Sequence, residues 1–209
     1  MLQKETINPN ALELLKVLQA DSLFPNFHLA GGTGLALQLG HRVSVDLDLF
    51  SLYAFDAELY LEYLDKKYHF VLDFSAVNTL KGSIGDLKVD FISHQYNLVE
   101  PIIETENIRL YSRADIAAMK VNAISGNGTR SKDFVDLYFL LEQYSVNQIL
   151  EFYKTKYNDR NAFHALKSLN YFDEVDLADW PVIIKNKKVT WNKIKATIDK
   201  HCLEYIKKF

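Results

Sequence analysis

The sequence predicts an α+β fold, in which a small mixed β-sheet core with flanking helices is followed by an all-helical C-terminal lobe. Two observations lead to this prediction. Short segments of alternating apolar and polar residues, the pattern of half-buried strands, are concentrated between residues 27 and 92. From Arg113 onward, helical patterns prevail instead. We therefore expect a sheet core over residues 1–105 and a helical lobe over residues 106–209, with their boundary within Pro101–Tyr111 and an active cleft between them.

The elements of the core are expected in a regular order. An amphipathic helix comes first, over Pro9–Ala20, and a short strand over Phe27–Ala30 leads into a second helix that begins near Thr33. A third helix is expected between Asp56 and Tyr68. The remaining strands are predicted over residues 43–49, 70–77, 78–84 and 87–92.

Two aspartates share one face of the strand predicted over residues 43–49. Its odd positions, from Val43 to Leu49, are apolar and face a core, so Asp46 and Asp48 point together toward the other face. At this spacing their Cβ atoms lie about 6–7 Å apart, close enough for both carboxylates to bind hard cations. Such a pair taken alone is more often a solvated strand face. Two like charges this near each other are usually neutralised by a divalent metal ion.

A glycine turn precedes this strand by a few residues. Gly31 and Gly32 follow a predicted strand, and Thr33 opens a helix. Glycines let the backbone approach a phosphate closely, and the amides of the first helical turn point toward such an anion. A Gly-Gly-Thr turn is a weak signal by itself, but it becomes specific when two spaced aspartates follow about fourteen residues later.

A third carboxylate lies on the strand predicted over residues 87–92. Leu87, Val89 and Phe91 share one face of this strand, and Asp90 lies on the other. If this strand pairs beside the first, the three aspartates can bind one Mg²⁺ for nucleotide phosphates and another that activates an attacking oxygen, about 3.5–4 Å apart. One aspartate on an amphipathic strand also needs no special explanation.

The helical lobe contains further charged residues near its apolar stripes. Lys120 lies beside the core edge of a helix that Ser112 caps, and a lysine there usually extends to water. Asp133 and Asp136 lie three apart near the start of the next helix, on a face we expect to be polar, where negative charge complements the helix dipole. In the alternative interpretation, Asp133 interacts with the substrate or with the nucleophile.

Three basic residues have two interpretations each. Arg130 and Lys132, which follow a glycine-rich connection, reach substrate phosphates or remain solvated. Arg42 complements the dipole of the helix before it or orders the aspartates through charge-assisted hydrogen bonds, and we favour the first interpretation.

Composition fits a globular cytoplasmic enzyme. The chain has 209 residues, of which 48% are hydrophobic and 24% charged, enough to bury a substantial core. No apolar run approaches the roughly 20 residues of a membrane span, and the amino terminus lacks the pattern of a signal peptide. The single Cys202 excludes an internal disulfide and fits a reducing compartment.

Positive charge is concentrated near the C-terminus. Residues 185–209 contain eight lysines and two acidic residues, a net charge of +6, whereas the whole chain carries −3. Such a segment attracts RNA or simply forms the solvated face of a terminal helix, and we favour the solvated face. The negative total argues against general DNA binding.

Two blocks of this sequence resemble a known family. The segment Ala30–Phe50, with Gly-Gly-Thr-Gly near its start and Asp-Leu-Asp-Leu-Phe at its end, resembles the signature of the AbiEii/AbiGii nucleotidyltransferase toxin family within the polymerase-beta-like nucleotidyltransferase superfamily. A second block follows in Ala118–Ile124 and Arg130–Tyr138. The resemblance covers about residues 25–145.

The resemblance implies a nucleotidyltransferase that uses a nucleoside triphosphate as substrate and Mg²⁺ as cofactor. It implies that Asp46 and Asp48 are metal ligands, that Gly31, Gly32 and Thr33 form the phosphate loop, and that Lys120 and Asp133 are active-site residues. The role of Asp90 as a ligand is more variable in the family. Its known members are the toxins of bacterial toxin–antitoxin or abortive infection systems.

The expected reaction transfers a nucleoside monophosphate to an RNA, such as tRNA, or to a protein, and a cognate antitoxin is the expected partner. Two alternatives stay open. The fold could serve as a non-catalytic module that binds nucleotides or partners. It could also modify a small molecule, as aminoglycoside nucleotidyltransferases do, because one fold supports many acceptors.

Overall fold

The computed structural model describes residues 1–158 and 161–208, and contacts within the chain group them into two compact units. The sheet unit comprises Met1–Gln38, Ser44–Tyr96 and Ile102–Tyr111. The helical unit comprises Leu39–Val43, Asn97–Pro101 and the chain from Ser112 onward. The backbone therefore passes from one unit to the other after residues 38, 43, 96, 101 and 111.

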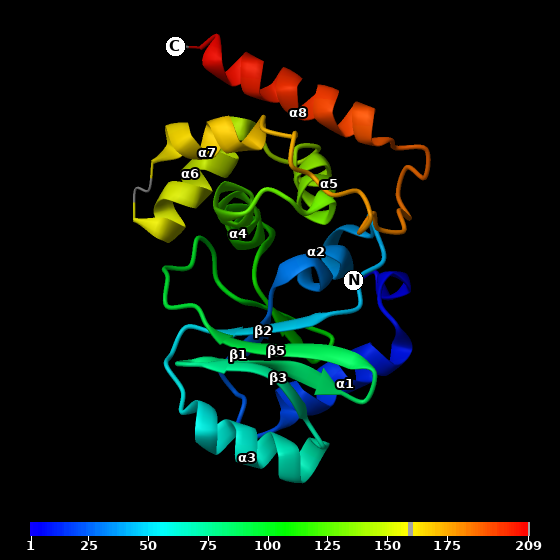
Figure 1. Cartoon of the computed structure of the whole chain (residues 1–209), viewed down its shortest axis with the longest axis vertical. Helices are drawn as coiled ribbons and strands as arrows, with labels where there is room; N and C mark the ends of the chain where they lie inside the picture. The colour runs from blue at the N-terminus through cyan, green and yellow to red at the C-terminus, as the bar shows by residue number, and fades with distance from the viewer. Residues whose placement is uncertain (159–160, 209) are drawn as a thin grey trace. The chain divides into compact units, whose positions relative to one another are not determined.

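The sheet unit is built on a seven-stranded mixed sheet with the strand order β3-β4-β5-β2-β1-β7-β6 (Figure 1). Strand β2 runs parallel to β5 on one side and antiparallel to β1 on the other. The mixed sheet confirms the predicted fold class for this part of the chain. The strands are β1 Phe27–Leu29, β2 Leu47–Ser51, β3 Val71–Ala76, β4 Thr79–Ile84, β5 Leu87–Ser93, β6 Ile103–Thr105 and β7 Ile108–Leu110.

Three helices flank this sheet, namely α1 (Pro9–Ala20), α2 (Gly31–Leu39) and α3 (Ala57–Tyr68). Figure 1 shows α3 on one side of the sheet and α2 on the other. Leu15 of α1 and Leu64 of α3 are fully buried in one apolar cluster with inward-facing residues of β2, β4 and β5. This cluster leaves the opposite side chains of these strands, including the aspartates, on the other face of the sheet.

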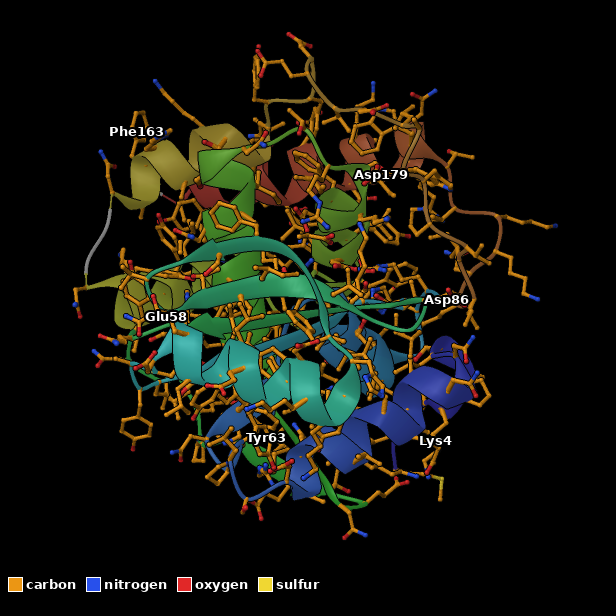
Figure 2. All side chains as sticks on the ribbon, turned by 60° about the horizontal axis from the view of Figure 1, so that its bottom comes forward. Lys4, Glu58, Tyr63, Asp86, Phe163 and Asp179 are labelled. Atoms are coloured by element: carbon orange, nitrogen blue, oxygen red, sulfur yellow. The ribbon has the colours of Figure 1, made fainter. Side chains whose placement is uncertain are left out.

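The aspartate that ends α1 is fixed by residues of α3. Tyr63, labelled in Figure 2, and Tyr68 donate their hydroxyls to Asp21 at 3.0 and 2.6 Å, and Lys67 Nζ donates at 2.7 Å. Burial alone would raise the pKa of Asp21, but these bonds and the backbone N–H of Leu23 lower it to about 2. The two helices are thereby joined on one face of the sheet.

The helical unit confirms the predicted C-terminal helices. Ser112 caps the first of them by accepting the backbone N–H of Asp115 (2.9 Å), as the Ser-x-x-Asp pattern predicts. No helix within residues 1–158 and 161–208 is both long and apolar enough to cross a membrane. The helices are α4 Arg113–Gly126, α5 Ser131–Leu140, α6 Val146–Tyr157, α7 Ala162–Leu169 and α8 Trp191–Ile206.

A buried ion pair holds the short segment 97–101 against these helices. The fully buried Asp115 of α4 accepts Nζ of Lys156 of α6 at 2.8 Å. Its carboxylate also accepts the backbone N–H groups of Val99 and Glu100 at 3.0 and 3.1 Å. This segment, although it lies between two strands in sequence, is therefore an integral part of the helical unit.

Three features differ from the sequence-based expectation, and two of them are the starts of elements. Strand β2 begins at Leu47 rather than Val43, because the backbone N–H groups of Val43 and Ser44 donate to Val182 and Thr6 (2.8 Å each) instead of to a neighbouring strand. Val45 is accordingly 47% exposed and does not face a core. Helix α2 already begins at Gly31.

The third difference is a hairpin that the sequence analysis did not predict. Strands β6 and β7 occupy the segment in which we expected only a boundary between the core and the lobe. Residues Glu106 and Asn107 turn between them with positive φ angles of 54° and 63°. Strands of three residues are too short for the alternation of apolar residues to identify them.

Candidate active site

Three charged residues stand side by side across the centre of the sheet. Asp48 on β2 is the register partner of Asp90 on β5, and Asp90 is in turn the partner of Lys81 on β4. Register partners on neighbouring strands point to the same face, so these side chains form one row. Strand β5 thus pairs beside β2, as the placement of Asp90 required.

Asp90 has a basic partner in this row. Lys81 Nζ donates to Asp90 Oδ2 at 2.8 Å, and the side chains of the lysine and the aspartate are 45% and 22% exposed. From the sequence, Asp90 was expected either to bind metal or to be an ordinary polar residue of an amphipathic strand, and its pairing with Lys81 was not predicted. Lys81 escaped notice because a lysine on an amphipathic strand carries no signal that identifies its partner.

The glycine turn lies directly against Asp48. Gly31 has a φ of +61°, and a Cβ atom built on it would lie 1.9 Å from Asp48 Oδ2. The backbone N–H of Ala30 donates to the carbonyl oxygen of Asp48 at 2.8 Å. Only glycine combines this backbone conformation with such a close approach. The carboxylate of Asp48 and the first turn of α2, whose amides attract anions, therefore form one local site.

Thr33 fixes the segment that carries the other aspartate. Its hydroxyl is buried and donates to the backbone carbonyl of Asp46 at 2.5 Å, and it lies 2.9 Å from Ser44 Oγ. Asp46 itself is partly exposed, one residue before β2. Thr33 thus holds Asp46 close to α2, and its assignment to the phosphate loop stays a prediction.

The donor set of this region suits a hard cation. Asp46 and Asp48 offer carboxylate oxygens, the ligands that Mg²⁺ prefers, and neither side chain is fully buried. Gly31 leaves open the space beside Asp48 that any side chain would fill. In the described part of the chain, no three His, Cys, Asp or Glu side chains are arranged to hold a metal ion together. Asp46 and Asp48 therefore fit Mg²⁺ as a two-carboxylate site.

The helical unit contains a second group of charged residues, and it is buried. The Asp136 carboxylate on α5 is completely buried and accepts four hydrogen bonds or ion pairs. His41 Nε2 lies 2.7 Å from its Oδ1, Arg42 contacts both oxygens at 2.6 and 3.0 Å, and Lys120 Nζ lies 2.6 Å from Oδ2. Asp136 is therefore the centre of this group.

Lys120 of α4 joins Asp136 to Asp133. Its Nζ donates to Asp133 Oδ1 at 2.7 Å, and both side chains are at least nine-tenths buried. The expectations that Lys120 extends to water and that the two aspartates lie on a polar face are therefore wrong. The other oxygen of Asp133, Oδ2, is buried and has no hydrogen-bond partner among the described residues.

Electrostatics in this group favour the charged forms of the acid and the lysine. Burial alone would raise the pKa of Asp136, but Arg42, Lys120 and the hydrogen bond from His41 hold it well below its usual value. Burial likewise opposes the charge of Lys120, yet Asp136 and Asp133 raise its pKa above the ordinary lysine value. Burial lowers the pKa of His41 despite its bond to Asp136.

The pairing of Arg42 with Asp136 was not predicted from the sequence. Arg42 does order an aspartate through charge-assisted hydrogen bonds, but that aspartate is Asp136 rather than Asp46 or Asp48. His41 and Arg42 are separated from Asp136 by about ninety-four residues of sequence, and periodicity carries no information over such a distance.

Arg130 and Lys132 remain reachable from solvent. Arg130 is the exposed N-cap residue of α5, and Lys132 is partly exposed in its first turn. The positions of these two residues do not indicate a contact with the buried acids, and they do not by themselves indicate a contact with a phosphate. Contact with a substrate phosphate stays a prediction for both residues.

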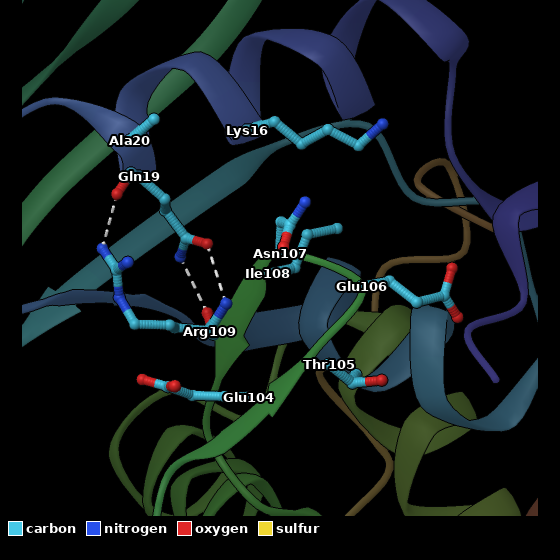
Figure 3. Close-up of a pocket in the computed structure, with 9 residues that line it drawn as sticks. All are labelled: Lys16, Gln19, Ala20, Glu104, Thr105, Glu106, Asn107, Ile108 and Arg109. Carbon is cyan, nitrogen blue, oxygen red and sulfur yellow. Dashed lines mark hydrogen bonds between the residues drawn. The ribbon is translucent and has the colours of Figure 1, made fainter.

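A cavity of about 600 Å³ in the sheet unit lies away from these groups (Figure 3). It is lined by α1 and the β6–β7 hairpin, where the Gln19 side chain bonds the backbone of Arg109 at 2.7 and 2.8 Å. None of the predicted site residues lines it. We therefore place the candidate site at Asp48, Asp90 and Lys81 together with the neighbouring Asp46, and call these four residues the aspartate row.

Comparison with known proteins agrees with these features. The chain is 26% identical over 200 residues to an uncharacterized protein of Aquifex aeolicus, covering 93% of this chain and 95% of that protein. The fold is similar to MenT4, a nucleotidyltransferase toxin of Mycobacterium tuberculosis, with a TM-score of 0.59, 15% identity and coverage of 92% and 82% of the two chains. It is also similar to the antibiotic-resistance factor ANT(2'')-Ia, with a TM-score of 0.51, 15% identity and coverage of 69% and 89%.

At these identities the solved structures show a shared fold, and the family match goes further. A sequence profile described as nucleotidyl transferase AbiEii toxin, type IV toxin–antitoxin system, matches residues 13–201. It spans nearly the whole chain and includes both the aspartate row and the buried charged group. The resemblance predicted from the two sequence blocks is thus confirmed, and the chain belongs to the AbiEii family of nucleotidyltransferase toxins.

Proposed function

We propose that this nucleotidyltransferase depends on Mg²⁺ and transfers a nucleoside monophosphate from a nucleoside triphosphate to an RNA or a protein. The observation that carries the proposal is the packing of Asp48 against Gly31, at the first turn of α2. A carboxylate that favours cations and a helix start that favours phosphates are brought together there. A metal–triphosphate complex has both kinds of charge.

In the sheet unit, Asp46 and Asp48 would hold the metal ion. When bound, Mg²⁺ supplies positive charge that offsets the negative charge of the triphosphate oxygens. The backbone amides at Gly31, Gly32 and Thr33 would bind the β- and γ-phosphates at the start of α2. Thr33 also keeps Asp46 in place through the hydrogen bond to its backbone. These residues position the α-phosphate for in-line attack.

The reaction exchanges one phosphorus–oxygen bond for another. A hydroxyl oxygen of the acceptor forms a bond to the α-phosphorus while the bond to the bridging oxygen breaks, so pyrophosphate leaves with that electron pair. The acceptor hydroxyl gives up its proton, which the leaving pyrophosphate or solvent water takes up. The protein contributes mainly position and charge, which is typical of phosphoryl-transfer enzymes.

For the helical unit, we propose that Lys120 and Asp133 are required for transfer. Asp133 Oδ1 is committed to Lys120, whereas the buried Oδ2 keeps its capacity to accept a hydrogen bond. An acceptor that is buried without a partner is costly and points to a ligand that supplies the missing donor. We assign this oxygen to the substrate or the nucleophile, and Arg130 and Lys132 to phosphate contacts.

The biological role we propose is that of a toxin held in check by a cognate antitoxin. The family description and the name of the M. tuberculosis relative support this role. We propose an RNA, such as tRNA, or a protein as the acceptor, because the lysines of residues 185–209, for which we favour a solvated helix face, do not select between the two. A small antitoxin gene beside this one would separate a toxin from a housekeeping transferase.

A transfer assay tests the proposal. The protein is incubated with each labelled triphosphate and Mg²⁺ in cell extract, and the labelled species is identified as RNA, protein or small molecule. We expect Asp48→Asn and Asp46→Asn to abolish labelling without loss of fold. Asp86→Asn removes the same charge in the exposed turn after β4 and should label normally. Unchanged labelling by the Asp48 variant would refute the assignment.

Two outcomes would favour the alternatives. Label in an aminoglycoside-like small molecule would support small-molecule transfer, an acceptor class suggested by the fold that the chain shares with the resistance factor. Triphosphate binding by calorimetry, without labelling of any species by the wild-type protein, would indicate a non-catalytic module.

A further inference from the structure

The aspartate row includes one positively charged group, the ammonium group of Lys81. Lys81, Asp90 and Asp48 come from three neighbouring strands in direct register, and Asp46 lies two residues before Asp48. Three carboxylates and one ammonium group give these four side chains a formal charge of −2. One divalent cation balances that charge. Without Lys81 the charge would be −3, which a single divalent cation leaves uncompensated.

The ion pair occupies the carboxylate that a second metal ion would need. Asp90 Oδ2 accepts Nζ of Lys81 at 2.8 Å, the distance of a direct charge-assisted hydrogen bond. An incoming divalent cation at this carboxylate would be repelled by the ammonium group. One oxygen of Asp90 is therefore already engaged by a cation of the chain, and among the described residues no three His, Cys, Asp or Glu side chains are arranged to hold a metal ion.

The lysine is held in position by the sheet. It is the direct cross-strand partner of Asp90, with Gly82 and Leu80 pairing to Val89 and Phe91 on either side. Register in a buried sheet is strongly specified, because a shift by one residue would turn the apolar side chains to the other face. The register therefore keeps Lys81 opposite Asp90, with its ammonium group within reach of the carboxylate.

We propose that Lys81 takes the place of a second divalent cation, so that the row holds one metal ion, at Asp46 and Asp48. This inference rests on the proposed function and revises the expectation that Asp90 binds metal. The contrasting interpretation is a simple cross-strand ion pair, which contributes little to stability when it is partly exposed. The two interpretations differ in the number of metal ions that a lysine variant binds.

Counting bound Mn²⁺ by electron paramagnetic resonance tests the inference without relying on activity. The full-length protein is titrated with Mn²⁺ alone. We expect one ion per chain for the wild type and two for Lys81→Met. Lys81→Arg keeps the charge and should bind one. The double variant with Lys81→Met and Asp90→Asn should return to one, because the second ion needs the released carboxylate.

Lys88→Met is the matched control. Lys88 lies on β5 two residues before Asp90, on the same face, and is exposed, so its substitution removes an equal charge nearby without releasing Asp90. We expect one ion for this variant. If it also gains a second ion, general charge rather than the Lys81 contact is responsible, and the inference fails. Circular dichroism of each variant confirms folding, and Lys81→Gln replaces Lys81→Met if the latter does not fold.

The outcomes separate this inference from the proposed function. One ion in both the wild type and Lys81→Met, with equal affinity, overturns the role of Lys81 and leaves the metal site at Asp48 intact. Two ions in the wild type also overturn it. Asp48→Asn should abolish the first ion. Binding that does not change in Asp48→Asn, or no binding by any variant, contradicts the proposed metal site as well.

Discussion

The acidic residues of the two units differ in their burial and in their partners. In the sheet unit, Asp46 and Asp48 keep partial exposure beside the glycine turn. In the helical unit, Asp133 and Asp136 are buried, and His41, Arg42 and Lys120 surround Asp136. A carboxylate that binds a cation from solution must stay reachable, whereas a carboxylate whose cations belong to the chain can be buried. We therefore expect Asp46 and Asp48 to bind a ligand, whereas Asp136, whose partners all belong to the chain, maintains the structure.

The largest difference in the free energy of unfolding is expected between two variants, Asp136→Asn in the helical unit and Asp48→Asn in the sheet unit. Asp136→Asn leaves Arg42 and Lys120 buried without their shared counter-charge, so we expect the free energy of unfolding to fall by about 3–5 kcal/mol. Asp48→Asn relieves repulsion in a partly exposed row and should change stability by less than about 1 kcal/mol. Urea unfolding followed by circular dichroism measures both. Equal losses would remove the distinction between the two units.

A smaller difference in stability is expected within the sheet unit, between alanine variants of Gly31 and Gly85. Gly31 and Gly85 both have positive φ, but a Cβ at Gly85 meets nothing within 4 Å, whereas one at Gly31 overlaps Asp48. Gly85→Ala should cost about 1–2 kcal/mol for the backbone conformation alone. Gly31→Ala should cost about 1–3 kcal/mol more and should also abolish Mn²⁺ binding. Identical melting curves for the two variants would show that the Asp48 side chain moves away from the added Cβ atom at little energetic cost.

The pH dependence of stability should show the smallest contrast. Burial and the positive charge of Arg109 lower the pKa of His28 in the sheet unit from 6.5 to about 4. The unfolded chain binds this proton more readily, so the contribution is fully present above pH 6.5 and is lost as the pH falls toward 4. Burial lowers the pKa of His41 in the helical unit in the same direction.

His28→Phe sharpens this contrast. The buried Nδ1 of His28 has no hydrogen-bond partner among the described residues, so phenylalanine forfeits no bond there. Between pH 6.5 and 4, the variant should lose less stability than the wild type, as measured by urea midpoints at each pH. A steeper loss in the variant would show that His28 is protonated in the folded state.

Local patterns were sufficient for most of the sheet unit. The alternation around Asp90 predicted β5 to within one residue, and the helices expected over Pro9–Ala20 and between Asp56 and Tyr68 are α1 and α3 of the structure. Such elements are predictable because the signal lies within a few residues of the chain. The start of β2 was not predictable, because it depends on hydrogen bonds to segments distant in sequence.

The charged groups show the same limit more clearly. Spacing identified Asp46 and Asp48 because their shared face depends only on local geometry. Spacing placed Asp136 on a polar face, since nothing near it in sequence shows that Arg42 is its partner. Lys81 was missed for the same reason, although it lies only nine residues from Asp90. The identity of a residue's neighbour across a sheet or between helices is a property of the fold.

The repeated passage of the backbone between the units has a consequence for working with fragments. A polypeptide that stops at Tyr111 would retain His41 and Arg42 while losing Asp136, and would leave the segment 97–101 without Asp115 and Lys156. A polypeptide that starts at Ser112 would lack both of those pieces. Neither half can be produced intact by one cut, so truncation is a poor way to assign an activity to either half, and point substitutions in the whole chain are required.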